Sequence, residues 1–267
     1  MGITTLAQYK AALTGPQQII PFTIAATTSV VGRWYDLWRT AVPIGAAPTS
    51  AVVPTNTTLG SFGQLDSTAK TLSFVGTRFN SFSPGVYVIC DRLSHQGGLS
   101  AVTTGAQTTN LPTAALTRYT SGEGVMIGLT VYTTIGATGT TITASYTDSG
   151  GTSGNTTPAV VFGGTGFREV NRMILLPLAA GDSGVQAVAN VNIVATTGTA
   201  GNFGVTLFKP LFTVVVDDTS GVKNGGFISG GVSGGFPEVL NGACLFAIAM
   251  STSTIIAGGG AFLIEEH

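Results

Sequence analysis

Short runs of alternating residues, separated by turn-forming residues, constrain the fold of this chain more than any other feature. In "VQAVANVNIV", residues 185–194, small or apolar side chains alternate with polar ones, and only Val188 and Val194 break the pattern. A period of two residues is typical of a half-buried β-strand. "TTITASY", residues 140–146, repeats this pattern and runs into "TDSGGTSGN", which has the composition of a turn.

Further strand candidates follow along the chain: "GVYVIC", "VMIGLTVYT", "MILLPL", "FGVTLF" and "LFTVVVDD". They are spaced by roughly 10 to 20 residues with no long helical pattern between them, which favours an antiparallel all-β fold. The sequence contains no repeat of roughly 20 to 50 residues, so we do not expect a propeller or a solenoid. The sequence therefore predicts an antiparallel β-sandwich or jelly-roll-like fold with a short N-terminal helix and extended loops.

The first residues, "MGITTLAQYKAALTGP", predict that short helix. Thr5 and Gln8 have the spacing of a capping box, and Gly15 followed by Pro16 would end the helix. The segment lacks a basic region followed by an apolar core, so we do not expect a secretory signal.

Residues 39–63, "RTAVPIGAAPTSAVVPTNTTLGSFG", are rich in Pro and Thr and nearly free of charge. Loops of this length in compact domains are usually functional or disordered. We expect an extended arm or loop that reaches outside its own domain, onto a neighbour. The predicted organisation is a helix and first strand in 1–38, the arm in 39–63 and a β-sandwich domain in 64–267. A single domain that includes the N-terminal part is the alternative.

An uncharged run from Ala243 to Ile264, "ACLFAIAMSTSTIIAGGGAFLI", is long enough to cross a membrane. However, "STST" at its centre and the three consecutive glycines both suit turns, and each half has the length of a strand. We therefore expect a β-hairpin and no membrane contact.

Charge is scarce, and its scarcity limits the functions open to the chain. There are 12 acidic and 11 basic residues, and charged residues make up 9% of the sequence, against roughly 25% in ordinary globular domains. The chain has no clustered basic residues to neutralise phosphates, so we expect no nucleic-acid partner. Its 43% hydrophobic content does not fit a disordered chain. Such a neutral surface favours burial between neighbours, so we expect a homo-oligomer, with a trimer as the first expectation.

The stretch "CDRLSHQGGLS", residues 90–100, is the strongest candidate for an active site. Nucleophilic catalysis needs a nucleophile and a base within hydrogen-bond reach. Ser94 and His95 are adjacent and would point to opposite faces of a strand, and Cys90 closes an apparent strand. We therefore predict a strand followed by a glycine turn, and no catalytic residues. A hydrolase that uses His95 is the alternative.

No metal or cofactor site emerges from the motifs. Cys90 and Cys244 are far apart, and the chain has neither C-x-x-C nor H-x-x-x-H, so zinc has no ligand set. We expect two free thiols, with a single disulfide as the alternative. "FGGTGFREV", residues 162–170, lacks the phosphate-loop patterns. Asp217 and Asp218, an adjacent pair, suit a strand end better than a catalytic dyad.

Interface candidates gather in "VGRWYDLWRT", residues 31–40, which holds both tryptophans. Trp and Arg dominate binding hot spots because they combine large apolar area with hydrogen-bonding groups. The alternative is that the aromatic side chains belong to the core. Two phenylalanines of the glycine-rich "NGGFISGGVSGGFPEV" complete the set of interface candidates, which is Trp34, Tyr35, Trp38, Arg39, Phe227 and Phe236.

The phrases "DRLSHQGGLS", "LPTAALTRYTSGEGV" and "TASYTDSGGTSG", together with the start "MGITTLAQYKAAL", resemble sequences of tailed-bacteriophage structural proteins, of the head decoration or cement type. The resemblance covers somewhat more than a quarter of the chain and includes no catalytic motif. It implies a virion component on the head, which is made in the host cytoplasm and contacts the major capsid protein or other virion proteins.

Together, these features predict a non-enzymatic capsid decoration or cement protein that stabilises the head by subunit contacts. Two alternatives remain open. One is a tail or baseplate protein of the same virion, which needs similar contact surfaces. The other is a carbohydrate-binding adhesin module, in which exposed Trp34 and Trp38 would form the stacking platform.

Overall fold

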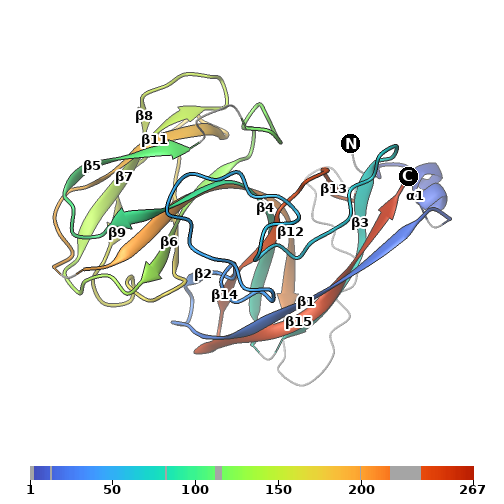
Figure 1. The fold of residues 1–267 in the computed structure, drawn as a ribbon, viewed down its shortest axis with the longest axis horizontal. Helices are drawn as coiled ribbons and strands as arrows, with labels where there is room; N and C mark the ends of the chain where they lie inside the picture. Colours follow the sequence, from blue (N-terminus) through green and yellow to red (C-terminus); the bar gives the residue numbers. More distant parts are fainter. Residues whose placement is uncertain (1–2, 13, 82, 112–115, 199, 217–235) are drawn as a thin grey trace.

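The fold of the chain is nearly all antiparallel β, as the sequence predicts (Figure 1). The computed structural model describes residues 3–12, 14–81, 83–111, 116–198, 200–216 and 236–267. The elements are helix α1 (Leu6–Ala12) and strands β1 (Gln17–Thr28), β2 (Trp34–Asp36), β3 (Leu72–Ser81), β4 (Gly85–Ser100), β5 (Gly105–Leu111), β6 (Met126–Thr133), β7 (Thr140–Asp148), β8 (Asn155–Thr156), β9 (Val160–Phe162), β10 (Met173–Leu176), β11 (Val185–Ile193), β12 (Asn202–Val216), β13 (Glu238–Val239), β14 (Leu245–Ser251) and β15 (Ile255–Glu266).

The strands form three sheets. A central six-stranded sheet has the order β10-β6-β12-β4-β14-β2. The first outer sheet has the order β1-β15-β3-β13, and the second outer sheet has the order β5-β11-β7-β8, with β9 also paired to β7. Figure 1 shows the long strands β4 and β12 between the two outer sheets.

Two hydrophobic cores share the central sheet. On β12, Phe203 and Leu207 belong to the core that includes residues of the second outer sheet. Further along the same strand, Phe212 and Val216 belong to the core that includes residues of the first outer sheet. The central sheet therefore takes part in two sandwiches, where the sequence pattern predicts one.

The N-terminal segment is built into this architecture. β1 pairs with β15 from Gln17↔Glu265 to Thr28↔Ile255, so the first long strand and the last one are neighbours. We propose on this ground that the N-terminal part and residues 64–267 form one domain. The boundaries of the predicted segments remain a proposal.

Helix α1 confirms the predicted N-terminal helix and its capping box. The backbone N–H of Thr5 donates to Gln8 Oε1 at 3.1 Å, and the backbone N–H of Gln8 donates to Thr5 Oγ1 at 3.2 Å. These two bonds satisfy donors that the first turn of a helix leaves free. Leu6 is 67% exposed, so this apolar side chain of the short helix is not buried by the described chain.

The uncharged run near the C-terminus forms two strands, as expected, but the strands are not a paired hairpin. β14 belongs to the central sheet and β15 to the first outer sheet, with the "STST" turn between them. The expected glycine turn is wrong, because Gly258–Gly260 lies inside β15. A Cβ at Gly260 would come within 2.1 Å of the carbonyl oxygen of Arg78, so the close approach of β3 requires a residue without a side chain.

Within the described residues, no helix is long and apolar enough to cross a membrane.

Candidate functional site

The aromatic segment that the sequence marks as an interface lies largely inside the molecule. Tyr35 is fully buried and Trp38 is 3% exposed, whereas Trp34 and Arg39 are half-buried. Only Trp34–Asp36 is a strand, and a turn follows. The structure thus matches the alternative that Tyr35 and Trp38 are core residues, and any external contact of Trp34 and Arg39 stays a prediction.

The other two interface candidates lie in different surroundings. Phe236 is half-buried and packs on a small cluster formed by Ile3 and Val75. Its backbone N–H donates to the carbonyl of Ile3 at 2.9 Å. Phe227 lies outside the described residues. The structure therefore does not bring the six interface candidates together at one surface.

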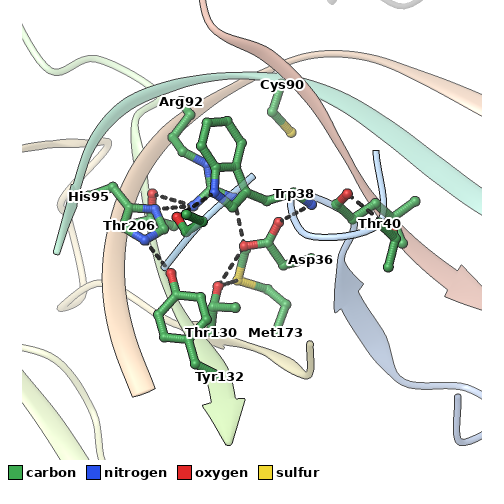
Figure 2. Close-up of polar contacts among 12 residues, drawn as sticks. Asp36, Trp38, Thr40, Cys90, Arg92, His95, Thr130, Tyr132, Met173 and Thr206 are labelled. Carbon is green, nitrogen blue, oxygen red and sulfur yellow. Dashed lines mark hydrogen bonds and ion pairs between the residues drawn. The ribbon is translucent and has the colours of Figure 1, made fainter. Parts of the chain in front are cut away.

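A buried polar network surrounds the stretch "CDRLSHQGGLS" (Figure 2). At its centre, the fully buried Arg92 donates from Nη2 to Asp36 Oδ2 at 2.6 Å and from Nη1 to Thr206 Oγ1 at 3.2 Å. The guanidinium carbon also lies 4.7 Å from the centroid of the Trp38 ring and 4.1 Å from that of Phe246. Aromatic faces and a carboxylate together replace the water that a buried guanidinium loses.

Asp36 accepts from two donors besides Arg92. Thr130 Oγ1 donates to its Oδ2 at 2.7 Å, and the backbone N–H of Trp38 donates to its Oδ1 at 2.9 Å. With the bond from Arg92, the carboxylate accepts hydrogen bonds on both oxygens while it is 1% exposed. A buried carboxylate with this many donors is well compensated for the loss of water.

His95 completes the network and is neutral within it. Arg92 donates to His95 Nδ1, and His95 Nε2 contacts the hydroxyl of Tyr132. A guanidinium can only donate, so Nδ1 accepts and the ring proton sits on Nε2, which donates to Tyr132. Burial, and then the positive charge of Arg92, hold the pKa of His95 well below its ordinary value. Burial likewise raises the pKa of Tyr132.

A neutral buried His95 predicts a specific loss of stability in acid. In the unfolded chain His95 takes up a proton below a pKa of about 6.5, whereas its pKa in the folded state is depressed. Protonation therefore favours unfolding, and the free energy of unfolding should fall by up to about 1.4 kcal/mol per pH unit below pH 6.5 from this residue. The His95→Gln variant, which keeps a donor and an acceptor, should lose this slope in urea titrations between about pH 7 and 5.

The matched control for that measurement is His267→Gln, which leaves His95 in place. In His267→Gln, the part of the pH dependence of the unfolding free energy that comes from His95 should be unchanged. An equal slope in the wild type and in His95→Gln would contradict the assignment of a neutral buried His95.

A second buried ion pair lies one residue away on β4. Arg118 donates from Nε to Asp91 Oδ2 at 2.8 Å and from Nη2 to Asp91 Oδ1 at 2.9 Å, a two-point contact. Asp91 Oδ1 also accepts from the backbone N–H of Cys244 at 2.8 Å. Burial raises the pKa of Asp91, and the bonds and charge of Arg118 oppose that rise. This pair ties the segment around Arg118 to β4 and β14.

The arm, residues 39–63, folds back onto these two ion pairs. Val52 and His95 exchange backbone hydrogen bonds of 2.9 and 3.0 Å, and Arg118 Nη2 donates to the carbonyl of Pro54 at 3.0 Å. The indole Nε1 of Trp38 donates to the carbonyl of Ala46 at 3.2 Å. The segment is extended, as expected, but these contacts place it on its own chain. The expected outward contact stays a proposal for its exposed side chains.

The two glycines of "CDRLSHQGGLS" make room for the arm. The predicted turn is wrong, because β4 continues through them to Ser100. A Cβ on Gly97 would lie 2.2 Å from the carbonyl oxygen of Pro48, and Gly98 has a φ of +78°. They form a bulge in the pairing with β12, where the register shifts between Leu99 and Gln96. The glycines thus serve the close approach of two backbones.

A cavity of about 380 Å³ lies between the arm and the network. Trp38 and His95 line it from the network, and the remaining lining residues come from the arm: Ala46, Pro48, Val52, Val53, Pro54, Thr58 and Leu59. Its wall is almost entirely apolar. Because both ring nitrogens of His95 are engaged inside the protein, the cavity has no free imidazole nitrogen for acid or base catalysis.

The thiols are equally unsuited to nucleophilic chemistry. Cys90 and Cys244 are both free and buried, as expected. Burial raises the pKa of Cys90 well above its ordinary value and that of Cys244 to about 12. A thiol with a raised pKa stays protonated and is a poor nucleophile. Among the described residues, no group of three or more His, Cys, Asp or Glu side chains could hold a metal ion.

Sequence reasoning missed the charged residues that build this site. Asp36 pairs with Arg92 across 56 positions, and Asp91 pairs with Arg118 across 27, so no local pattern reveals either pair. One signal was available: Arg92 stands beside a strand of apolar residues in a chain with very few charges. Charged residues are almost never fully buried unless they are paired, so such a position indicates a partner elsewhere in the chain.

Comparisons with known proteins do not assign the chain to a family. No family model matches the chain, and no curated protein sequence matches it. Among solved structures, the infectious bursal disease virus VP2 subviral particle is similar with a TM-score of 0.20 and 8% identity, covering 95% of this chain and 81% of that one. T=1 particles derived from infectious bursal virus give a TM-score of 0.20 and 8% identity, covering 94% and 78%. At these TM-scores the similarity establishes neither a common fold nor a common function.

Proposed function

We propose that this protein is a non-enzymatic structural component of a virion, and more narrowly a decoration or cement protein on the capsid of a tailed bacteriophage. Three features support the proposal: the sequence resemblance to phage structural proteins, the 9% content of charged residues, and a candidate site whose histidine and thiols are engaged or buried. The polar network holds the arm in place and offers no free catalytic group.

The observation that carries the proposal is the exposure of apolar side chains on the arm. Among the described residues, 15 large hydrophobic side chains are exposed, and five of them fall within the 25 positions of 39–63. Clustered apolar side chains on an ordered segment are typical of protein contacts. These arm residues are Val42, Ile44, Val52, Val53 and Leu59.

The arm is suited to such contacts because it is already ordered. The bonds from His95, Arg118 and Trp38 fix its backbone before any partner arrives, so binding costs less conformational entropy. The partners that we propose are sister copies, in a trimer, and the major capsid protein or another virion protein. The site of action would be the outer capsid surface, after synthesis in the host cytoplasm.

The structure weakens one alternative. An adhesin module with a stacking platform at Trp34 and Trp38 needs both rings at the surface, and Trp38 is 3% exposed beneath the arm. A tail or baseplate role needs the same neutral contact surface as a head role, so it remains an outcome of the experiment below.

The experiment is to locate the tagged chain in purified particles by electron microscopy. Regular density on the capsid lattice would support the decoration role. Density confined to the tail or baseplate would place the protein there instead. Absence of the chain from purified particles would overturn the virion proposal.

The arm supplies a prediction about assembly. The double variant Val53→Asp/Leu59→Asp should sediment as a monomer at micromolar concentration, whereas the wild type forms a homo-oligomer. Two charges placed in an apolar contact lose their water without gaining partners, which should weaken association at least about tenfold. Analytical ultracentrifugation measures both species.

The matched control is Val161→Asp/Val194→Asp, which changes two valines that are also exposed but lie outside the arm. This variant should sediment like the wild type. A wild-type chain that is a stable, soluble monomer at these concentrations would contradict the proposed oligomer.

A further inference from the structure

The cavity between the arm and the buried network has two aromatic rings in its wall. Trp38 and His95, both almost fully buried, contribute these rings, and their centroids lie 6.2 Å apart. The volume of about 380 Å³ is more than twice that of a cavity of ~150 Å³ that binds one benzene molecule. The cavity is therefore large enough for a ligand with two rings.

Trp38 is fixed in place before any ligand arrives. Its indole Nε1 donates to the carbonyl of Ala46 at 3.2 Å, and the guanidinium carbon of Arg92 lies 4.7 Å from the centroid of the ring. The backbone of the arm also lies directly against the indole at Gly45 and Gly60, where a Cβ would come within 2.5 and 2.7 Å of ring atoms. A wall that is ordered in advance lowers the entropy cost of binding.

The polar side chains that line the cavity are already engaged within the chain. Both ring nitrogens of His95 are bound inside the network, and the indole N–H of Trp38 is bound to the arm. The hydroxyl oxygen of Thr58 accepts from the backbone N–H of Thr55 at 2.9 Å. Among the described residues, no charged side chain lines the cavity. A charged or strongly polar ligand would thus lose its water there without gaining partners.

We propose that this cavity binds a neutral, apolar molecule with the size of a two-ring aromatic hydrocarbon. Aliphatic side chains and two aromatic rings provide an apolar wall for such a ligand, and the absence of charge disfavours ions. The volume lies within the range of about 300–1,000 Å³ that is typical of small-molecule sites. Val53 and Leu59 line the cavity and are 46% and 56% exposed, so a ligand can enter from the solvent side of the arm.

This inference goes beyond the proposed virion role and does not rest on it. Ligand binding is a property of the single chain and can be measured on purified protein. The virion role concerns the location of the chain in a particle, which electron microscopy measures. Failure of one proposal therefore leaves the other intact.

The test is a fluorescence titration of the intact chain with phenylnaphthylamine, a neutral probe that becomes brighter in an apolar environment. The probe should bind saturably at one site, and naphthalene should displace it. Naphthoate has the same two rings and a carboxylate, which would lose its water without a partner in the cavity. It should compete at least about tenfold more weakly than naphthalene. In NMR spectra, the indole N–H signal of Trp38 should shift when the probe binds.

Two variants at exposed positions of the wall should weaken binding and leave the fold intact. Ala46→Phe adds a ring that takes up part of the cavity, and it should weaken probe binding about tenfold or more. Leu59→Ser removes part of the apolar wall and should weaken binding by a smaller factor. The matched control is Leu65→Ser, at a leucine that is 74% exposed and does not line the cavity. It should bind the probe as the wild type does.

The proposal is overturned if the probe shows no saturable binding, if naphthoate competes as well as naphthalene, or if both variants bind the probe unchanged. It is also overturned if the probe binds only where the chain is dissociated into monomers. A sister copy would then be the occupant of the cavity, and no small molecule would be needed.

Discussion

Replacing Asp36 with Ala is expected to lower the free energy of unfolding by about 3–5 kcal/mol. The variant removes the carboxylate that accepts from Arg92 Nη2 at 2.6 Å and leaves a guanidinium in the core. Arg92 Nε already has no hydrogen-bond partner among the described residues, so the variant would leave both Nε and Nη2 unpaired and the buried positive charge without its carboxylate. Urea denaturation near neutral pH, followed by circular dichroism, measures the loss.

The control separates the uncompensated charge from the loss of packing. In the double variant Asp36→Ala/Arg92→Met both charges are gone, and most of the stability should return because an apolar side chain suits the rings of Trp38 and Phe246. The exposed Arg78→Ala should have almost no effect. A double variant that is no more stable than Asp36→Ala would contradict the explanation by an unpaired buried charge.

The second large effect on the free energy of unfolding is expected when a buried phenylalanine is truncated in either of the two cores. Phe262→Ala should cost about 3–5 kcal/mol, because this fully buried ring lies 4.6 Å from the centroid of Phe22 and 5.6 Å from that of Phe74. Phe203→Ala should cost a similar amount, since Phe203 is also fully buried and lies 4.9 Å from the centroid of Phe162.

These two variants also test the proposed single domain. If the central sheet couples its two sandwiches, either variant shifts one common transition, and tryptophan fluorescence and circular dichroism give the same midpoint. Both tryptophans lie at the central sheet, so fluorescence reports on that sheet. Two separate midpoints, each moved by only one of the variants, would show that the sandwiches unfold as independent units. Val161→Ala, at an exposed position, serves as the control.

Local signals in the sequence predicted the elements well. The period of two in residues 140–146 and 185–194 corresponds to β7 and β11, and the Thr5–Gln8 capping box corresponds to the start of α1. Alternation and capping depend on neighbours within a few positions, so they can be recognised without a tertiary structure. The uncharged run near the C-terminus was correctly assigned to strands for the same reason.

Glycine was the residue type that local reasoning interpreted wrongly. Gly97 and Gly98, and likewise Gly258–Gly260, stand within strands and not in turns. In each case another backbone passes where a side chain would be, the arm at Gly97 and β3 at Gly260. A glycine that allows close approach has the same sequence appearance as a glycine that forms a turn.

By itself, the sequence determined that the chain is antiparallel β with a short capped helix, because hydrophobic periodicity and capping act between near neighbours. The scarcity of charge led us to expect no nucleic-acid partner, and that expectation stays a prediction. Only the tertiary structure decided that Asp36 would meet Arg92, that the arm would cover His95 and Trp38, and that one sheet would serve two cores. Those contacts join residues dozens of positions apart, and they form through strand register and the burial of side chains from several sheets at once.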